Sequence, residues 1–277
     1  MFKIIIQLRI QIYNKIIKRP LYPLIIFFLS LLYKNQIIME INVNTKVGEI
    51  VKENFRTARL FDKNKIDFCC GGGISLEEAC KKSDIELSAI LPELESLVVT
   101  NDPDSKYINS LELDELCDYI EKRHHTYVND NLPFLQQKLE KLCKVHGDNH
   151  SELYEIRDLF DGAATNLSMH MEKEELVLFP YIRKMVKYKR EGLGTADEFG
   201  EVKQTIDFMQ HEHQTEGARF EKISILTSNY TCPPDGCNTY RVTYQTLNDF
   251  EKDLHQHIHL ENNILFEKSL ALEKELT

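Results

Sequence analysis

The sequence lacks a surplus of positive charge. Its 277 residues include 34 lysines and arginines against 44 aspartates and glutamates, which gives a formal net charge of -10. Proteins that bind nucleic acids regardless of sequence need an excess of Lys and Arg to displace counterions from phosphates. The acidic balance therefore argues against this class of function, and we expect no nucleic-acid partner.

The chain also lacks the dense cysteine pattern of a disulfide-stapled secreted scaffold, because only seven cysteines are spread along its length. A reducing cytoplasm is therefore the expected location. Tryptophan is absent, whereas histidine occurs ten times and gathers with acidic residues in the C-terminal two thirds. Clusters of imidazoles and carboxylates are typical of metal sites.

Residues 1–38 contain no Asp or Glu, yet they lack an apolar run of the about 20 residues that a membrane-spanning helix needs. The run from Leu21 to Tyr33 is shorter and is interrupted by a proline and a serine. One interpretation is a signal sequence or anchor, but no small-residue cleavage site follows it. We favour the other, in which residues 1–38 are a spurious extension, Met39 is the true start and no membrane association is expected.

The rest of the sequence contains helical periodicity. Residues 39–100 are predicted to form a small helical domain, in which Ser75 and Glu78 form a capping box that opens one of the helices. The stretch Thr100–Ser105 predicts a linker to a second domain at 108–277. Apolar residues at the spacing of one helix face open the small domain: Val47, Ile50, Val51, Phe55, Ala58 and Leu60.

The second domain is predicted to be an up-down-up-down four-helix bundle, so the fold class is all-α. Helical periodicity covers four segments, with short breaks at Gly147, Gly192–Gly194 and Cys232–Cys237. Four long helices with short connections fold into such a bundle. The segments span about residues 110–145, 151–188, 196–229 and 239–274.

An internal repeat marks the second and fourth of these helices, because the pattern His-x3-Glu-x3-Leu-Phe occurs twice. At about 100° per residue, side chains four residues apart lie on one face of a helix. Each His and Glu can therefore reach one metal ion or an adjacent pair, while Glu175 is expected to point elsewhere. The two copies are His170, Glu174, Leu178 and Phe179, and His257, Glu261, Leu265 and Phe266.

The first and third helices supply histidines as well. His125, His170, His213 and His257 follow one another at intervals of 45, 43 and 44 residues. In an antiparallel bundle, equal steps of one helix and one loop return the chain to the same height, so the four imidazoles can converge on one layer. The additional His124 and His211 leave the choice open in these two helices, and His124 is the alternative to His125.

The candidate ligands predict two metal ions rather than one. Four imidazoles and two carboxylates exceed what one tetrahedral zinc takes, and no thiolate is among them. Because a carboxylate has two oxygens, each can bridge two cations while two histidines hold each ion. Iron suits this mixed set, although spacing alone leaves manganese and zinc open. The complete set is His125, His170, Glu174, His213, His257 and Glu261.

From Met39 to the C-terminus the sequence resembles the bacterial di-iron family for the repair of iron centres, a hemerythrin-like bundle preceded by a small Cys-Cys-Gly-Gly domain. The resemblance implies two non-haem iron ions per chain, with the four histidines as terminal ligands and the two glutamates as bridges. The matching motifs are Asp67-Phe-Cys-Cys-Gly-Gly72, His124-His125-x6-Leu132-Pro133, His170-Met-x-Lys-Glu174-Glu-x-x-Leu178-Phe-Pro180, Glu212-His213-x3-Gly217 and His257-x-x-Leu260-Glu261-Asn-Asn-x-Leu265-Phe266. Glu267 departs from the pattern, since a proline is usual there.

The resemblance also implies a function: the repair of iron-sulfur clusters damaged by nitric oxide or oxidative stress, with damaged iron-sulfur proteins as partners. Iron donation and nitric oxide chemistry at the centre are the two routes, and only nitric oxide reduction would make the protein an enzyme. The alternative is a hemerythrin-like protein that binds or senses oxygen or nitric oxide as a small ligand. A di-iron oxidase generally uses more carboxylates, which counts against that class.

Two pairs of cysteines have alternative interpretations. By resemblance, Cys69 and Cys70 belong to the family's N-terminal domain and imply thiol chemistry or a contact between the subunits of a homodimer. The other interpretation is that they are small residues in a tight glycine turn. Cys232 and Cys237 flank a Pro-Pro-Asp-Gly loop, where they are free to form a reversible disulfide.

Overall fold

Helices account for the regular structure in the part of the chain that the computed structural model describes, residues 41–100, 102–194 and 199–277. Within these ranges the pairing of strands is limited to one isolated bridge, between Lys46 and Ser75. The all-α prediction is therefore confirmed. The predictions for residues 1–38 lie outside the described residues.

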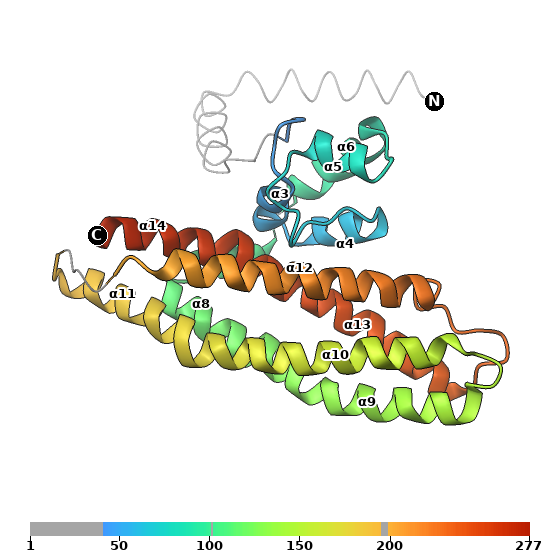
Figure 1. The fold of residues 1–277 in the computed structure, drawn as a ribbon. Coiled ribbons are helices and arrows are strands. Elements are labelled where there is room, and N and C mark those ends of the chain that lie inside the picture. The colour runs from blue at the N-terminus through green and yellow to red at the C-terminus, as the bar shows by residue number, and fades with distance from the viewer. Residues whose placement is uncertain (1–40, 101, 195–198) are drawn as a thin grey trace, which may run out of the picture. The chain divides into compact units, whose positions relative to one another are not determined.

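Four long helical rods form the bundle (Figure 1). The first rod packs on the second, the second on the third, the third on the fourth and the fourth on the first, so each has two antiparallel neighbours. This is the predicted up-down-up-down order. The rods are α8 (Leu113–Ile120), η1 (Glu121–His125) and α9 (Thr126–His146); α10 (Glu152–Lys173), η2 (Glu174–Leu178) and α11 (Phe179–Glu191); α12 (Val202–Leu226); and α13 (Asn238–Leu260), η3 (Glu261–Leu265) and α14 (Phe266–Leu276).

Apolar residues at helical spacing hold the bundle together. Phe160, Phe220 and Phe250 come from α10, α12 and α13 and are fully buried, with ring centroids 5.6–6.3 Å apart. Replacing a buried phenylalanine by alanine typically costs about 3–5 kcal/mol of folding free energy. This aromatic cluster therefore fixes the spacing of three rods along one half of the bundle.

Three of the four rods contain a single π-helical turn, which the sequence pattern did not predict. η1, η2 and η3 are each five residues long, and their positions coincide with candidate metal ligands. Glu174 and Glu261 are the first residues of η2 and η3, and His125 is the last residue of η1. A π turn inserts an extra residue into an α-helix and re-aims the side chains around it.

The small N-terminal domain contains one more helix break than expected. The periodic run from Val47 to Leu60 forms two helices, because Asn54 ends the first one. The Asn54 side chain donates to the carbonyls of Leu97 and Thr100, so it serves tertiary contacts instead of continuing the helix. The helices are α3 (Val47–Glu53), α4 (Arg56–Lys63), α5 (Leu76–Lys82) and α6 (Leu87–Val98).

The predicted linker at Thr100–Ser105 is wrong, because helix α7 (Pro103–Ser110) begins inside it. Asp102 is buried and its carboxylate accepts hydrogen bonds from the Phe55 amide and from the Ser105 hydroxyl. Prolines at the first positions of a helix favour helix formation, and Pro103 has this position. The connection is thus a packed element, not a flexible spacer.

The small domain packs on the bundle through a glycine-lined contact. Asn263, on η3, donates from its side-chain amide to the carbonyls of Phe68 and Cys69. Gly48 and Gly72 face that amide so closely that a Cβ on either would lie within 2.6–2.8 Å of its oxygen. The two glycines therefore permit the close approach of the Cys-Cys-Gly-Gly turn to the bundle.

Replacing Gly72 by alanine is expected to lower the free energy of unfolding by about 1–3 kcal/mol, because the new methyl group would meet the Phe68 carbonyl and the Asn263 amide. Urea denaturation measures this difference. Gly73→Ala is the matched control, since nothing lies within 4 Å of its Cβ position. Equal stability of the two variants would show that the contact is not as close as described.

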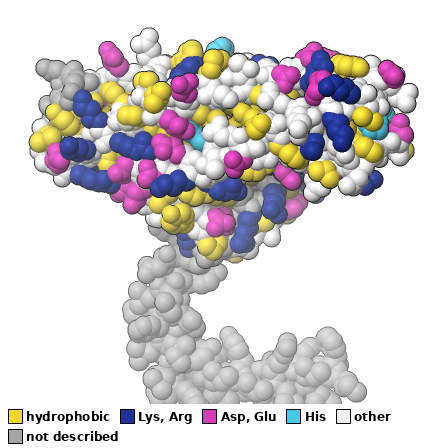
Figure 2. Space-filling view, turned by 90° about the horizontal axis from the view of Figure 1, so that it is seen from below, with side chains coloured by type: hydrophobic (Ala, Val, Ile, Leu, Met, Phe, Trp, Pro, Cys, Tyr) yellow, Lys and Arg dark blue, Asp and Glu magenta, His cyan; other side chains and the backbone are white. Residues whose placement is uncertain are grey.

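The surface is mixed in charge. On the face seen in Figure 2, Lys and Arg side chains alternate with Asp and Glu, and histidine reaches the surface at only a few points. None of the helices among the described residues combines the length and the apolar character required to cross a membrane.

Candidate metal centre

The six predicted ligands meet in the middle of the bundle as two overlapping sets of four. The first set is His125, Glu174, His257 and Glu261, and in the second His170 and His213 take the place of the other two histidines. The potential ligand atoms of each set lie within 4.8 Å of one another. All six residues are at most 3% exposed. Each glutamate therefore faces two histidine pairs at once.

Each carboxylate places its two oxygens toward different histidines. For Glu174, Oε2 lies 3.3 Å from His125 Nε2 and Oε1 lies 3.4 Å from His170 Nε2. For Glu261, Oε1 lies 2.8 Å from His257 Nε2 and Oε2 lies 3.1 Å from His213 Nε2. The predicted bridging arrangement needs this division, because one oxygen must serve each of two cations.

The two carboxylates of the centre face imidazole nitrogens and accept no well-formed hydrogen bond. None of the four carboxylate oxygens of Glu174 and Glu261 has a hydrogen-bond partner among the described residues, and neither has Nε2 of His125 or His257. An isolated ionised carboxylate buried in protein costs many kcal/mol unless it is paired or binds a metal. These orphaned atoms, with their mixed nitrogen and oxygen donors, fit metal ions.

The electrostatic field also favours positive charge at this point. Burial alone would raise the pKa of Glu261, but His257 and His213 lower it well below its usual range. Burial alone would lower the pKa of His170, but Glu174 and Glu261 raise it to about 10. Both shifts have the same meaning: the two carboxylates stay ionised and stabilise cations next to them.

A second layer of hydrogen bonds orients three of the histidines. Nδ1 of His125 lies 2.7 Å from Glu175, and Nδ1 of His170 lies 2.9 Å from Glu212. In each pair Nδ1–H donates to the carboxylate, so Nε2 keeps its lone pair for a metal ion. Glu175 is exposed and lies outside both four-residue sets, as expected, but it also holds a histidine of the neighbouring rod, which the sequence pattern did not predict.

The third orienting residue shows how this layer could have been found. Nδ1 of His213 lies 2.9 Å from Oδ1 of Asn262, which directly follows Glu261 in the sequence. Glu175 directly follows Glu174, and Glu212 directly precedes His213. Each orienting residue is thus the sequence neighbour of a ligand on one rod and the partner of a ligand on another. Polar residues that directly adjoin the predicted ligands in the sequence are therefore the signal that identifies these orienting residues.

The Leu-Phe half of the repeat also serves the centre. Phe179 stacks on the ring of His125 with centroids 5.7 Å apart, and Phe266 stacks on His213 at 5.9 Å. Both phenylalanines are fully buried. Each copy of the repeat therefore provides one His, one Glu and one aromatic ring that packs against the histidine of an adjacent rod.

The structure separates His125 from the alternative, His124. His124 lies outside both four-residue sets, its Nδ1 lies 3.1 Å from Asp253, and its ring stacks on His257 with centroids 5.4 Å apart. His211 is exposed, on the rim of a pocket. The structure thus places His125 and His213 at the centre and the two alternatives beside it.

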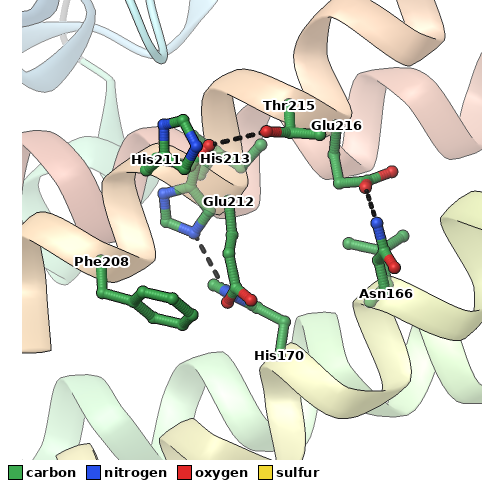
Figure 3. Close-up of a pocket in the computed structure, with 10 residues that line it drawn as sticks. Asn166, His170, Phe208, His211, Glu212, His213, Thr215 and Glu216 are labelled. Carbon is green, nitrogen blue, oxygen red and sulfur yellow. Dashed lines mark hydrogen bonds and ion pairs between the residues drawn. The ribbon is translucent and has the colours of Figure 1, made fainter.

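One side of the centre opens into a small pocket of about 230 Å³ (Figure 3). His170 and His213 contribute to its wall, together with Phe208 and Glu212. Glu216 lies deeper in the wall, where it accepts a hydrogen bond of 2.8 Å from Asn166, and burial raises its pKa. A diatomic molecule or a hydrated ion can therefore approach the His170 and His213 side.

The Cys-Cys-Gly-Gly turn lies next to this centre. The side-chain amide of Asn262 donates to the carbonyl of Cys69, while its oxygen faces His213, so one residue joins the turn to a candidate ligand. The thiol of Cys70 lies 3.6 Å from the Cβ position of Gly217 on α12. Cys69 is buried, and its pKa is raised by the neighbouring Cys70 and by burial. With Asp67, the two thiols form a third group of potential metal ligands.

Comparisons with known proteins match two separate parts of the chain. The Hemerythrin HHE cation binding domain matches residues 118–269, and a domain of unknown function called ScdA_N matches residues 43–98. The iron-sulfur cluster repair protein ScdA of Staphylococcus haemolyticus is 32% identical over 80% of this chain and 96% of its own length. The iron-sulfur cluster repair protein YtfE is 34% identical in Musicola paradisiaca and 33% in Yersinia pseudotuberculosis, over 81% and 82% of this chain and 95% and 97% of the relatives.

Proposed function

Because this chain belongs to the family of iron-sulfur cluster repair proteins with a hemerythrin HHE cation-binding domain, we propose that it holds two iron ions and acts in the repair of iron-sulfur clusters damaged by nitric oxide or oxidants. The observation that carries the proposal is the pair of buried glutamates without hydrogen-bond donors, each facing two histidines. Its clients are damaged iron-sulfur proteins, and its expected location is the cytoplasm.

Each iron ion would take two histidines and share both carboxylates. His125 and His257 would hold one ion, and His170 and His213 the other, with Glu174 and Glu261 as bridges. When bound, the pair supplies redox chemistry and a source of iron. Iron suits imidazole and carboxylate ligands together, and two carboxylates neutralise only part of the charge of two divalent ions. The remaining positive charge would therefore favour the binding of a small anion.

The two sides of the centre have different surroundings. His125 is covered by Phe179, and its neighbour His257 by His124. His170 and His213 instead line the pocket that Figure 3 shows. Nitric oxide, oxygen or a ligand that removes iron would thus reach the ion held by this second pair. Glu212 lies at this opening and pairs with Lys173 as well as with His170.

The thiols of the Cys-Cys-Gly-Gly turn are assigned the role of a transfer site. Asp67 Oδ1 accepts from the backbone amides of Cys69 and Cys70, which holds the turn in one conformation. Two cysteine sulfurs and a carboxylate can bind ferrous iron transiently, and the metal ion would then displace the thiol protons. Cys70 lies beside Gly217, four residues after His213, so the turn is close to the proposed centre.

Repair can be measured with a [4Fe–4S] dehydratase inactivated by nitric oxide. Anaerobic addition of the iron-loaded protein is expected to restore dehydratase activity, and Cys70→Ser is expected to slow recovery several-fold while leaving iron content unchanged. Cys80→Ser is the matched control, because Cys80 is also a thiol of the small domain but is buried in its core. If fully loaded protein restores no activity, the repair function is rejected.

The alternative function, binding or sensing of oxygen or nitric oxide, is favoured by the pocket beside His170 and His213. It predicts a stable, stoichiometric nitric oxide complex with no recovery of a damaged cluster enzyme. The two functions therefore separate in the same experiment, because one outcome is recovered activity and the other is a spectral change alone.

Removal of the metal is expected to lower the midpoint of thermal unfolding by about 5–10 °C, because the folded state alone presents the complete ligand set. Without cations, Glu174 and Glu261 remain buried without donors. Calorimetry before and after dialysis against a ferrous chelator measures the shift, and reloading with ferrous iron serves as the control. An unchanged midpoint would mean that the carboxylates are satisfied in some other way.

A further inference from the structure

A second group of reactive side chains lies at the end of the bundle where α9 ends and α13 begins. Nε2 of His146, from the last turn of α9, lies 3.3 Å from Sγ of Cys237. In the same loop, Asp235 lies 3.1 Å from Nε2 of His150. The loop between α12 and α13 is thus held against the connection between α9 and α10 by two histidine contacts. Neither contact involves the proposed metal centre.

Cys237 combines three features of a reactive thiol. It is exposed, it is the N-cap of the 23-residue helix α13, and an imidazole faces its sulfur. A helix N-terminus stabilises negative charge, and so does a hydrogen-bonded histidine. The backbone amide of Tyr240 and the side chain of His146 lower the pKa of Cys237 to about 7.

A second thiol lies across the same turn. The amide of Gly236 donates to the carbonyl of Pro233 at 2.9 Å, which closes a tight turn between the two cysteines. Sγ of Cys232 folds back over this turn and lies 2.5 Å from the position that a Cβ on Gly236 would take, directly before Cys237. Both cysteines are free thiols here. A turn that brings its ends together suits a short disulfide loop.

We propose that Cys237 and Cys232 form a redox-active thiol pair that is oxidised by low-molecular-weight disulfides, with Cys237 as the attacking sulfur, His146 as its base and Cys232 as the resolving thiol. The partner is identified by its chemistry: an electrophilic S–S bond small enough to reach an exposed loop. This site is separate from the metal centre and does not depend on the proposed repair function.

The reaction is balanced in two exchange steps. The Cys237 thiol loses its proton to His146, and its sulfur attacks one sulfur of the disulfide RSSR, whose S–S bond breaks and releases RS⁻. Cys232 then loses its proton and attacks Sγ of Cys237, so that the protein disulfide forms and the second RS⁻ leaves. Overall, two protein thiols are oxidised to one disulfide, and RSSR with the two protons gives two molecules of RSH.

The test uses the full-length, iron-loaded protein and glutathione disulfide as the probe, with peptide mass mapping as the readout. Wild type is expected to gain a Cys232–Cys237 disulfide without a lasting adduct. Cys232→Ser is expected to stop at one glutathione on Cys237, and Cys237→Ser to gain no modification in this loop. Iron content is expected to be the same in all three proteins. Modification at Cys70 with none in the loop overturns the proposal.

A pH profile of alkylation separates the assigned roles from a merely exposed cysteine. Cys237 is expected to react with iodoacetamide with a midpoint near pH 7, and at pH 6.5 about fivefold faster than an ordinary exposed thiol. His146→Gln is expected to move the midpoint upward, with His150→Gln as the matched control on the same connection. A midpoint that is equal in wild type and His146→Gln contradicts the role of the imidazole, even if both variants fold fully.

Discussion

Glu174→Gln is expected to remove both iron ions, so that iron content falls from about two per chain to well below one after anaerobic loading and desalting. The reason is the geometry of the bridge: Oε1 faces His170 and Oε2 faces His125, so the loss of one negative charge weakens both sites together. A ligand that served only one ion would leave the other in place. The readout is iron analysis of the folded protein by atomic emission.

Glu172→Gln is the matched control for this variant. It makes the same change of charge on the same rod two residues earlier, but Glu172 is exposed and lies outside the metal-binding sets. Its iron content is expected to equal that of wild type. Retention of one full iron in Glu174→Gln would show that this carboxylate serves a single ion.

His125→Ala and His124→Ala are expected to differ sharply, although the two residues are adjacent and both are at most 1% exposed. His125 faces Glu174 and lies in the first four-residue set, whereas the Nδ1 atom of His124 lies against Asp253. His125→Ala should therefore lose about one of the two ions, and His124→Ala should retain both.

Both substitutions delete a buried imidazole, so the cavity cost to folding is similar, about 2–4 kcal/mol by analogy with other large buried side chains. Thermal unfolding of the metal-free forms checks that similarity. A difference in iron content between variants of equal metal-free stability then reports ligation alone. Loss of iron in His124→Ala with retention in His125→Ala would show that His124, and not His125, is the ligand.

The sequence predicted the parts of the site that depend on local periodicity. The pairs His170–Glu174 and His257–Glu261 follow from a spacing of four on one helix, and the structure brings each pair together. His125 and His213 required the additional step that equal intervals return the chain to one height. The order of the four rods follows from four long helices with short connections. Neither inference needed knowledge of side-chain contacts.

The parts that escaped prediction depend on long-range contacts. The π turns at Glu174 and Glu261 have no characteristic amino-acid sequence by which they could be predicted. They direct these carboxylates toward the neighbouring rods. Helix geometry correctly directs Glu175 away from the ligand sets, but it considers one rod and so does not reveal the contact of Glu175 with His125 on another. Likewise, Asn54 and Asp102 read as ordinary helix and linker residues until their partners are known.

The choice between His124 and His125 shows the same limit. Two adjacent histidines point about 100° apart on a helix, so periodicity alone would separate them only if the exact phase of the rod were known. The π turn η1 ends at His125 and changes that phase. His124 and His125 are therefore distinguished by their contacts with Asp253 and Glu174 on other rods, and no local sequence pattern contains these contacts.

The most direct test of the account is Mössbauer spectroscopy, together with iron analysis, on anaerobically loaded wild type and Glu174→Gln. We expect about two iron ions per wild-type chain as an exchange-coupled pair, because two carboxylates would join them, and no such pair in the variant. A single uncoupled iron in wild type, or an unchanged coupled pair in Glu174→Gln, would contradict the bridged centre on which the proposed repair function rests.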